Sequence, residues 1–343
     1  MNKELELWQF VAERLRRNEA VMLLVVAESS GSSPGRQGYK MAVGSDGELI
    51  GSIGGGVMEV NLVEGARTLL SASPQSGDTA SEPGAVATGL PTGEFRPLVK
   101  EQVHRKNAAN PSGMICSGKQ TVIFRLLLPD DAKPVDGIID ALNSRRPERL
   151  TISRQELSVE PPSDETQNSD LYFEKRSDTD FIFSEKLGFK NDLYIVGGGH
   201  CALALSELMS KMDFHISLFD DRPDLNTIDK NRFAHKIAII DTYETISNYI
   251  PSGDNVYVIV MTLGYRSDGI VIRKLLDKEF KYFGVLGSKA KMVTLLNVLK
   301  GEGVPGETLE KIHTPIGLPI NSRTPEEIAI SIAAEIIAVK NAD

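Results

Sequence analysis

A glycine-rich turn in the second half of the chain has the residue types and spacing of a phosphate-binding loop. An apolar run ends at Val196, and Gly197, Gly199 and Ala202 follow it. The first glycine permits a tight turn after a strand, and the second lets backbone amides approach a phosphate at the N-terminus of the next helix. Asp220 ends the following apolar run, about 20 residues later, where an acidic side chain can accept a hydrogen bond from a ribose hydroxyl. The pattern predicts a Rossmann-type turn for a nucleotide-like or pterin-like phosphate ligand.

This turn leaves the identity of the ligand open. Asp220 suits an unphosphorylated ribose, but it does not single out NAD, and a domain of this fold can also lack a ligand. His200 follows Gly199 directly, and Asp221 follows Asp220. We expect both side chains beside the ligand, with His200 as a loop residue and not as a catalytic base.

A second glycine cluster, Gly54, Gly55 and Gly56, precedes an expected helix in the first half of the chain. Successive unhindered amides at a helix N-terminus form an anion site, to which Arg36 can add a charge-assisted contact. Glu59, in the first turn of that helix, is placed to accept hydrogen bonds from a heterocycle. Alternatively, the glycines make only a tight turn and Glu59 only favours the helix dipole. The sequence leaves these two interpretations open.

The chain contains two cysteines, Cys116 and Cys201. Cys116, in a short turn between Gly113 and Gly118, is either a reactive or metal-proximal thiolate or a small buried hydrophobic residue, and the residues alone favour the second. Cys201, at an expected helix start, is predicted to pack in the core. Two cysteines cannot supply the four ligands of an iron–sulfur cluster or of a cysteine-rich zinc site, and they fit a reducing compartment.

The elements that must position the first turn alternate regularly. Strand-like runs lie at residues 193–196, 216–219, 237–240, 256–261 and 282–286. Helical patterns lie at residues 201–212, 268–278 and 290–299. Such alternation predicts a parallel, doubly wound α/β sheet with helices on both faces. Thr324 as N-cap, Pro325 as first residue and Glu327 as capping-box partner predict the start of a final helix.

The first half has the mixed signals of an α+β domain. Expected helices cover residues 5–15, 57–70 and 135–143, and the second is expected to bury Val57, Val60, Val63 and Leu70. Expected strands lie at residues 21–27, 40–43, 48–52, 121–128, 150–159 and 171–173. Residues 71–112 are rich in small and turn-forming residues and are expected to be mostly a mobile loop. The chain thus predicts an N-terminal α+β domain over residues 1–188 and a Rossmann-type domain over residues 189–343.

Composition narrows the classes of partner. The 343 residues carry a formal net charge of −9, and no cluster of lysine and arginine suggests a nucleic-acid surface. No apolar run reaches the 18 residues of a membrane span. The first residues contain early acids and lack the apolar core of a signal peptide, so a cytoplasmic protein is expected.

Seven stretches, in order and spanning nearly the whole chain, resemble the XdhC/CoxI family of accessory factors for molybdenum hydroxylases. They are residues 28–36, 51–59, 113–118, 196–200, 220–223, 284–288, and 313–318 with 324–328. The resemblance implies a chaperone that binds molybdenum cofactor (molybdopterin) and protects it while a cysteine desulfurase supplies its terminal sulfur. It also implies delivery to an apo molybdenum hydroxylase resembling xanthine dehydrogenase, an enzyme of purine catabolism, and by analogy a homodimer.

The resemblance also suggests roles for the candidate residues. The cofactor's phosphate would lie on a glycine-rich helix N-terminus, its pterin would bond Glu59 or Asp220, and Cys116 would shield or ligate the molybdenum. The chain departs from the family at Ser117, where glycine is usual, at Val57, where some relatives have cysteine, and at Tyr265, where histidine is common.

Two other functions remain open from the sequence. An NAD(P)-dependent oxidoreductase would need a proton donor beside the nicotinamide, and no candidate residue is apparent. A nucleotide-sensing regulator would bind NAD or a mononucleotide but no pterin. Xanthine dehydrogenase activity itself is disfavoured, because the iron–sulfur clusters of that enzyme need more cysteines than this chain has.

Overall fold

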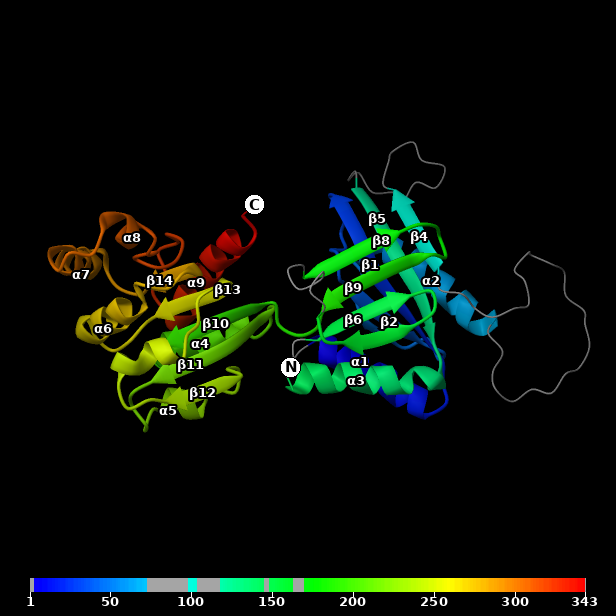
Figure 1. Ribbon diagram of the computed structural model, residues 1–343, viewed down its shortest axis with the longest axis horizontal. Helices are drawn as coiled ribbons and strands as arrows, with labels where there is room; N and C mark the ends of the chain where they lie inside the picture. The colour runs from blue at the N-terminus through cyan, green and yellow to red at the C-terminus, as the bar shows by residue number, and fades with distance from the viewer. Residues whose placement is uncertain (1–2, 73–97, 104–117, 145–147, 163–169, 343) are drawn as a thin grey trace, which may run out of the picture. The chain divides into compact units, whose positions relative to one another are not determined.

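The computed structural model describes residues 3–72, 98–103, 118–144, 148–162 and 170–342. The chain divides into two compact units, residues 1–188 and residues 189–343 (Figure 1). Among the described residues, no helix is both long enough and apolar enough to cross a membrane.

The first unit is built on a five-stranded antiparallel sheet in the order β3-β2-β1-β5-β4. The strands are β1 (Val21–Gly31), β2 (Lys40–Gly44), β3 (Leu49–Gly51), β4 (Leu98–Val103) and β5 (Gly118–Leu127). The long pair of β1 and β5 runs from Val21 opposite Leu127 to Gly31 opposite Gly118. Gly31 and Gly118 therefore lie opposite each other at the same end of the β1–β5 pair.

The continuous apolar run of β1 serves two cores, because successive strand residues point to opposite faces. Val21, Leu23 and Val25 pack with helices α1 (Lys3–Arg16) and α3 (Ala132–Ser144). Met22, Leu24 and Val26 pack on the other face with helix α2 (Gly56–Ala72). A second antiparallel sheet has the order β7-β6-β9-β8. Its strands are β6 (Arg149–Ser153), β7 (Leu157–Glu160), β8 (Leu171–Lys175) and β9 (Phe181–Lys186).

Three expectations for the first unit need correction. Val63 and Leu70 of α2 are buried as expected, but Val57 and Val60 are exposed, and the buried face runs through Met58, Leu62, Ala66 and Leu70 at helical spacing. Residues 98–103 lie in the stretch expected to be mostly loop, yet they form β4 against β5. The expected strand at 150–159 is a hairpin of two strands, and β9 was not expected. Residues 73–97 and 104–112 lie outside the described part of the chain.

The second unit has the predicted parallel sheet, in the order β12-β11-β10-β13-β14. The strands are β10 (Asn191–Val196), β11 (Phe214–Asp220), β12 (Lys236–Ile239), β13 (Gly253–Val260) and β14 (Phe280–Val285). The chain adds β11 and β12 on one side of β10 and then β13 and β14 on the other. The order therefore reverses between β10 and β13, the place where α/β sheets bind ligands at their carboxyl edge.

Helices cover both faces of this sheet, which confirms the doubly wound fold. On one face α4 (His200–Met209) and α9 (Pro325–Lys340) pack against Leu193 and Ile195 of β10. On the other face α6 (Tyr265–Leu275), α7 (Lys289–Gly301) and the short helix η2 (Tyr243–Asn248) pack in the core that contains Val196. The helices α5 (Asn226–Asp229) and α8 (Gly306–Glu310) complete the unit. Thr324 and Glu327 form the predicted capping box of α9.

Candidate functional site

The turn between β10 and α4 contains two glycines with opposite environments. Gly197 has a φ of +111°, and a Cβ there would lie 2.3 Å from the carbonyl oxygen of Met261. Only glycine fits that position. Gly199 is the N-cap residue of α4, with a φ of −70°, and no atom lies within 4 Å of the place where its Cβ would be. The first glycine packs against β13, and the second faces open space at the start of a helix.

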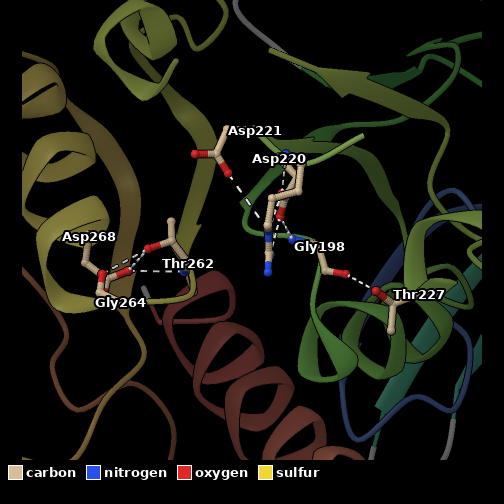
Figure 2. A network of polar contacts seen from close by, with 8 residues as sticks. Gly198, Asp220, Asp221, Thr227, Thr262, Gly264 and Asp268 are labelled. Atoms are coloured by element: carbon tan, nitrogen blue, oxygen red, sulfur yellow. Dashed lines mark hydrogen bonds and ion pairs between the residues drawn. The ribbon is translucent and has the colours of Figure 1, made fainter. Parts of the chain in front are cut away.

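Asp220 ties this turn to the end of β11 (Figure 2). Its carboxylate is fully buried and accepts four hydrogen bonds. The Gly198 amide donates at 2.6 Å, the Arg222 amide at 2.9 Å, and Arg222 Nε and Nη2 at 2.8 Å each. Burial alone would raise the pKa of Asp220, but these hydrogen bonds outweigh it and hold the pKa below its usual value.

The four donors fill the four lone-pair sites of the Asp220 carboxylate. A ribose hydroxyl could bond Asp220 only if Arg222 moved away, so the predicted ribose contact stays a prediction. At the surface of this pair lie the side chains of Arg222, 32% exposed, and Asp221, 38% exposed. His200 is exposed at the first position of α4.

A second buried aspartate lies beyond β13. Asp268 is fully buried and accepts hydrogen bonds from the amide of Thr262, at 3.1 Å, and from the Thr262 hydroxyl. Its other oxygen accepts a hydrogen bond from Lys291 Nζ at 2.7 Å. Gly264, the N-cap residue of α6, has no atom within 4 Å of its Cβ position. The start of α6 is therefore also open, and its first turn contains the buried Asp268 that is paired with Lys291.

In the first unit, Glu59 closes the glycine turn that leads into α2. Its Oε2 accepts hydrogen bonds from Ser52 Oγ at 2.8 Å and from the amides of Ile53 and Gly55 at 2.9 Å each. Burial tends to raise the pKa of Glu59, but the Ser52 hydroxyl and the backbone amides together lower it by more. One carboxylate oxygen is therefore used by the turn itself, whatever else Glu59 binds.

The glycines of this turn also differ in environment. Gly54, Gly55 and Gly56 have φ values of +128°, +74° and +72°. A Cβ on Gly54 would lie 2.3 Å from the amide nitrogen of Gly35, whereas a Cβ on Gly55 would meet nothing within 4 Å. Gly55 thus repeats the open position that Gly199 has in the second unit.

Gln120 joins the motif segments of the first unit, although no sequence pattern singled it out. It is buried, its Oε1 accepts from Ser33 Oγ at 3.1 Å, and its Nε2 donates to the Ile53 carbonyl at 2.8 Å. A Cβ on Gly118 would lie 2.6 Å from the Ser33 amide. The stretches 28–36 and 51–59 therefore meet beside the start of β5.

The remaining candidate residues differ in their position and exposure. Arg36 is exposed in the loop after β1. Cys116 and Ser117 lie outside the described residues. Cys201 packs against the core of the second unit as predicted, and burial, with a smaller effect of Glu326, raises the pKa of its thiol. Among the described residues, no group of three or more histidine, cysteine, aspartate or glutamate side chains is placed to hold a metal ion.

Two family models match the segments that carry these turns. The XdhC and CoxI family matches residues 14–79, and the XdhC Rossmann domain matches residues 193–336. The chain belongs to the XdhC and CoxI family. Its two open glycines, Gly55 and Gly199, lie one in each matched segment.

Relatives of this XdhC-type chain share modest identity with it. "Uncharacterized protein YqeB" of Escherichia coli is 22% identical over 92% of the chain and 43% of its own length. A Bacillus subtilis protein named as a probable xanthine dehydrogenase subunit is 27% identical over 50% of each protein. The chain spans about half the length of these curated relatives. A crystal structure described as a xanthine dehydrogenase from Bacillus halodurans covers 99% of the chain, with 96% of its own length aligned, at a TM-score of 0.68 and 21% identity. That likeness shows a shared fold.

Three charged side chains at the carboxyl edge of the XdhC Rossmann sheet were not among the candidate site residues that the sequence predicted. They are Arg222, Asp268 and Lys291. A signal existed for each, because Arg222 follows the acidic end of β11, Asp268 is in the first turn of α6, and Lys291 is in the first turn of α7. First turns of helices at the carboxyl edge of a parallel sheet are where ligand contacts gather.

Proposed function

We propose that this chain binds molybdenum cofactor and serves the maturation of a molybdenum hydroxylase that resembles xanthine dehydrogenase. Membership of the XdhC and CoxI family supports the proposal, as does the name of the Bacillus subtilis relative. On this proposal the chain holds the cofactor in the cytoplasm and transfers it to the apoenzyme. A cysteine desulfurase is the partner that would supply the terminal sulfur, and a homodimer is the proposed assembly.

One observation carries the proposal: the open position at Gly199. The neighbouring Gly198 has its Cβ position 2.8 Å from Ile228, and Gly197 is packed against Met261, but Gly199 has nothing within 4 Å. The chain is therefore packed tightly up to the helix start and then leaves space at the first free amides of α4. A cofactor phosphate suits such a place, since unpaired amides and the helix dipole both stabilise an anion.

Charged side chains at the carboxyl edge of this sheet fit the rest of the cofactor. Arg222 and Lys291 supply positive charge, and Asp221 supplies an exposed carboxylate that can accept hydrogen bonds from the amino and imino groups of a pterin. When bound, the cofactor would supply a redox-active molybdenum centre for the client enzyme. The chain's own residues would orient the cofactor and exclude water from it.

The first unit offers a second set of candidate contacts. The open face of Gly55 and the exposed guanidinium of Arg36 can bind an anion, and Glu59 has a second carboxylate oxygen for a heterocycle. Cys116 is proposed as the thiolate that contacts molybdenum, because soft thiolate ligands suit this metal. This assignment rests on the resemblance of residues 113–118 to the family.

The two other functions have less support. An NAD-dependent oxidoreductase or an NAD sensor of the usual type needs an acidic acceptor for the ribose hydroxyl. Here the acceptor, Asp220, has its lone pairs filled by Gly198 and Arg222. NAD binding would therefore require the Arg222 contacts to break.

An anaerobic titration of the purified protein with molybdenum cofactor tests the proposal, with NAD and NADP in parallel. Bound pterin is measured by its fluorescence after oxidation. We expect saturable binding near one cofactor per chain, no turnover of NADH, and transfer of the bound cofactor to an apo-hydroxylase. Tight NAD binding without cofactor binding would overturn the proposal.

A further inference from the structure

Two cations at the carboxyl edge of the Rossmann sheet are each held by a buried aspartate. Arg222 donates through Nε and Nη2 to Asp220, and Lys291 donates through Nζ to Asp268. Both aspartate side chains are 0% exposed, whereas the side chains of Arg222 and Lys291 are 32% and 30% exposed. Each carboxylate is thus hidden behind its cation, and the positive end of each pair is the part that reaches the surface.

The two ion pairs, Arg222–Asp220 and Lys291–Asp268, are both linked to the region of the glycine turn after β10. On the side of β11, the Gly198 amide donates to Asp220. On the side of β13, the Thr262 amide donates to Asp268, and this same nitrogen would lie 2.9 Å from a Cβ on Gly197. Since β11 and β13 are the two neighbours of β10 in the sheet, the Arg222–Asp220 pair follows the strand on one side of β10 and Asp268 follows the strand on the other side.

These contacts leave donors on both cations. A guanidinium carries five N–H donors and an ammonium carries three. Arg222 uses Nε and Nη2 on Asp220, and Lys291 uses one donor on Asp268. Asp221, at 3.9 Å from Arg222 Nε, is too distant for a hydrogen bond to it. The backbone amides of Gly198 and Thr262 also donate hydrogen bonds to the two buried carboxylates, so neither carboxylate depends on its cation alone. Arg222 and Lys291 can therefore donate their remaining N–H groups to a further anion.

We propose that Arg222 and Lys291 are paired anion-binding side chains, and that the ligand of this crevice carries two anionic groups, one on each side of the β10 turn. The identity of that ligand rests on the proposed function. Molybdenum cofactor fits, because it carries two separate anionic groups, a phosphate ester and a molybdenum–dithiolene group. NAD fits less well, because its negative charge is concentrated in one central pyrophosphate and its oxidised nicotinamide ring is cationic.

Binding of molybdenum cofactor to charge-removal variants tests this pairing. Arg222→Met and Lys291→Met are each expected to raise the dissociation constant at least about tenfold, the effect of one charge-assisted hydrogen bond. Lys289→Met is the matched control, because Lys289 is exposed in the same first turn of α7 and has the same charge. It is expected to change binding less than about twofold. Equal affinities for the Lys291 and Lys289 variants would overturn the pairing.

Loss of Lys291 alone leaves Asp268 buried without its cation, which can unfold the domain. The double variant Asp268→Asn/Lys291→Met removes both charges and keeps an amide oxygen to accept from Thr262. We expect it to fold like the wild type and still to lose about tenfold in cofactor affinity. A folded double variant with wild-type affinity would contradict the proposal.

Inorganic phosphate separates this inference from the proposed function. A wild-type chain that binds no molybdenum cofactor overturns the function, and inorganic phosphate, which can occupy each cation separately, then tests the two cations directly. Inorganic phosphate should raise the Tm of the wild type and of Lys289→Met, because a ligand that binds only the folded state stabilises it. It should raise the Tm of the Arg222→Met and double variants by less than half as much. An equal rise in all variants, or no rise in any, would overturn the inference whatever the cofactor titration gives.

Discussion

Gly197 lies so close to Met261 that a Cβ on the glycine would be 2.3 Å from the Met261 carbonyl oxygen. Its φ of +111° is also a conformation that other residues rarely adopt. The same turn ends at Gly199, whose φ of −70° suits any residue and whose Cβ position is open. One turn thus contains a glycine that the fold requires and a glycine that the fold does not require.

The two glycines should therefore respond differently to alanine. Gly197→Ala is expected to lower the free energy of unfolding by more than about 2 kcal/mol, through clash and backbone strain. Gly199→Ala is expected to cost less than about 1 kcal/mol, the difference between glycine and alanine at an N-cap. It should still weaken cofactor binding, because the methyl group occupies the space beside the first amides of α4. Urea unfolding and cofactor titration measure the two effects, and a Gly199→Ala variant with unchanged affinity would remove this turn from the binding site.

Glu59 should matter for stability before any ligand is added. Glu59→Ala leaves Ser52 Oγ and the amides of Ile53 and Gly55 without their shared acceptor, so we expect a loss of about 2–3 kcal/mol. Glu59→Gln keeps one acceptor oxygen and should cost about half as much. If urea unfolding shows both variants as stable as the wild type, Glu59 does not hold the turn and its role lies with the ligand alone.

The contribution of Glu59 should also depend on pH in a defined direction. Burial tends to raise its pKa, but the hydrogen bonds from Ser52 and the backbone amides hold the pKa below its usual value. A pKa lowered by folding gives stability that is complete above the unfolded value, about 4.3, and is lost as the pH falls through the folded value. The stability difference between wild type and Glu59→Gln should therefore narrow on going from about pH 6 to about pH 3. A difference that stays constant over this interval would contradict the assigned hydrogen bonds.

The sequence predicted the Rossmann sheet well because its central strands β10, β11 and β13 contain mostly buried apolar runs and because helices with a clear period separate the strands. The glycine turn after β10 was predicted because its fingerprint is local: a strand, Gly197, Gly199 and a helix start occur within a few residues. The capping box of Thr324 and Glu327 is also local. Patterns of this kind depend on the residues' own conformational limits and not on distant contacts.

What the sequence did not predict depends on contacts between distant segments. Asp268 and Lys291 lie on different helices and meet only through the packing of β13 beside β14. Gln120 joins Ser33 to Ile53 across two loops. The valine spacing of α2 predicted that Val57 and Val60 would be buried. In the structure both are exposed, and the helix buries the neighbouring face, which includes Met58. Such choices are made by the tertiary partner, which a single sequence does not reveal.

Tyr282 should make the second unit sensitive to alkaline pH. Its buried phenol donates a hydrogen bond to Glu335, which also accepts from the Gly317 amide at 2.7 Å. Burial, then the hydrogen bond to Glu335, raises the pKa of Tyr282. A pKa raised by folding gives stability that is complete below the unfolded value of about 10 and is lost as the pH rises towards the folded value.

Tyr282→Phe is thus expected to cost about 1.5–3 kcal/mol at neutral pH, the value of a hydrogen bond to a charged group, and less as the pH rises above about 10. The matched control is Tyr172→Phe, because the exposed Tyr172 donates at 2.8 Å to Glu174 on the surface. Its cost should stay within about 0.5 kcal/mol at every pH. Urea unfolding at stepped pH distinguishes them, and equal costs for the two variants would show that burial of Tyr282 has no energetic consequence.

The two cysteines provide the last comparison, since they are matched in chemistry and differ in assigned role. Cys201 packs in the core, and burial raises the pKa of its thiol, so it should be protonated and slow to alkylate at neutral pH. Cys201→Ala should therefore leave the ratio of molybdenum to bound pterin unchanged. If Cys116 is the proposed ligand of the metal, Cys116→Ala should keep pterin binding and lower that ratio by half or more, because a thiolate ligand is lost. Metal analysis beside pterin fluorescence on the isolated complexes measures the ratio, and equal ratios for both variants would leave Cys116 without a role in holding molybdenum.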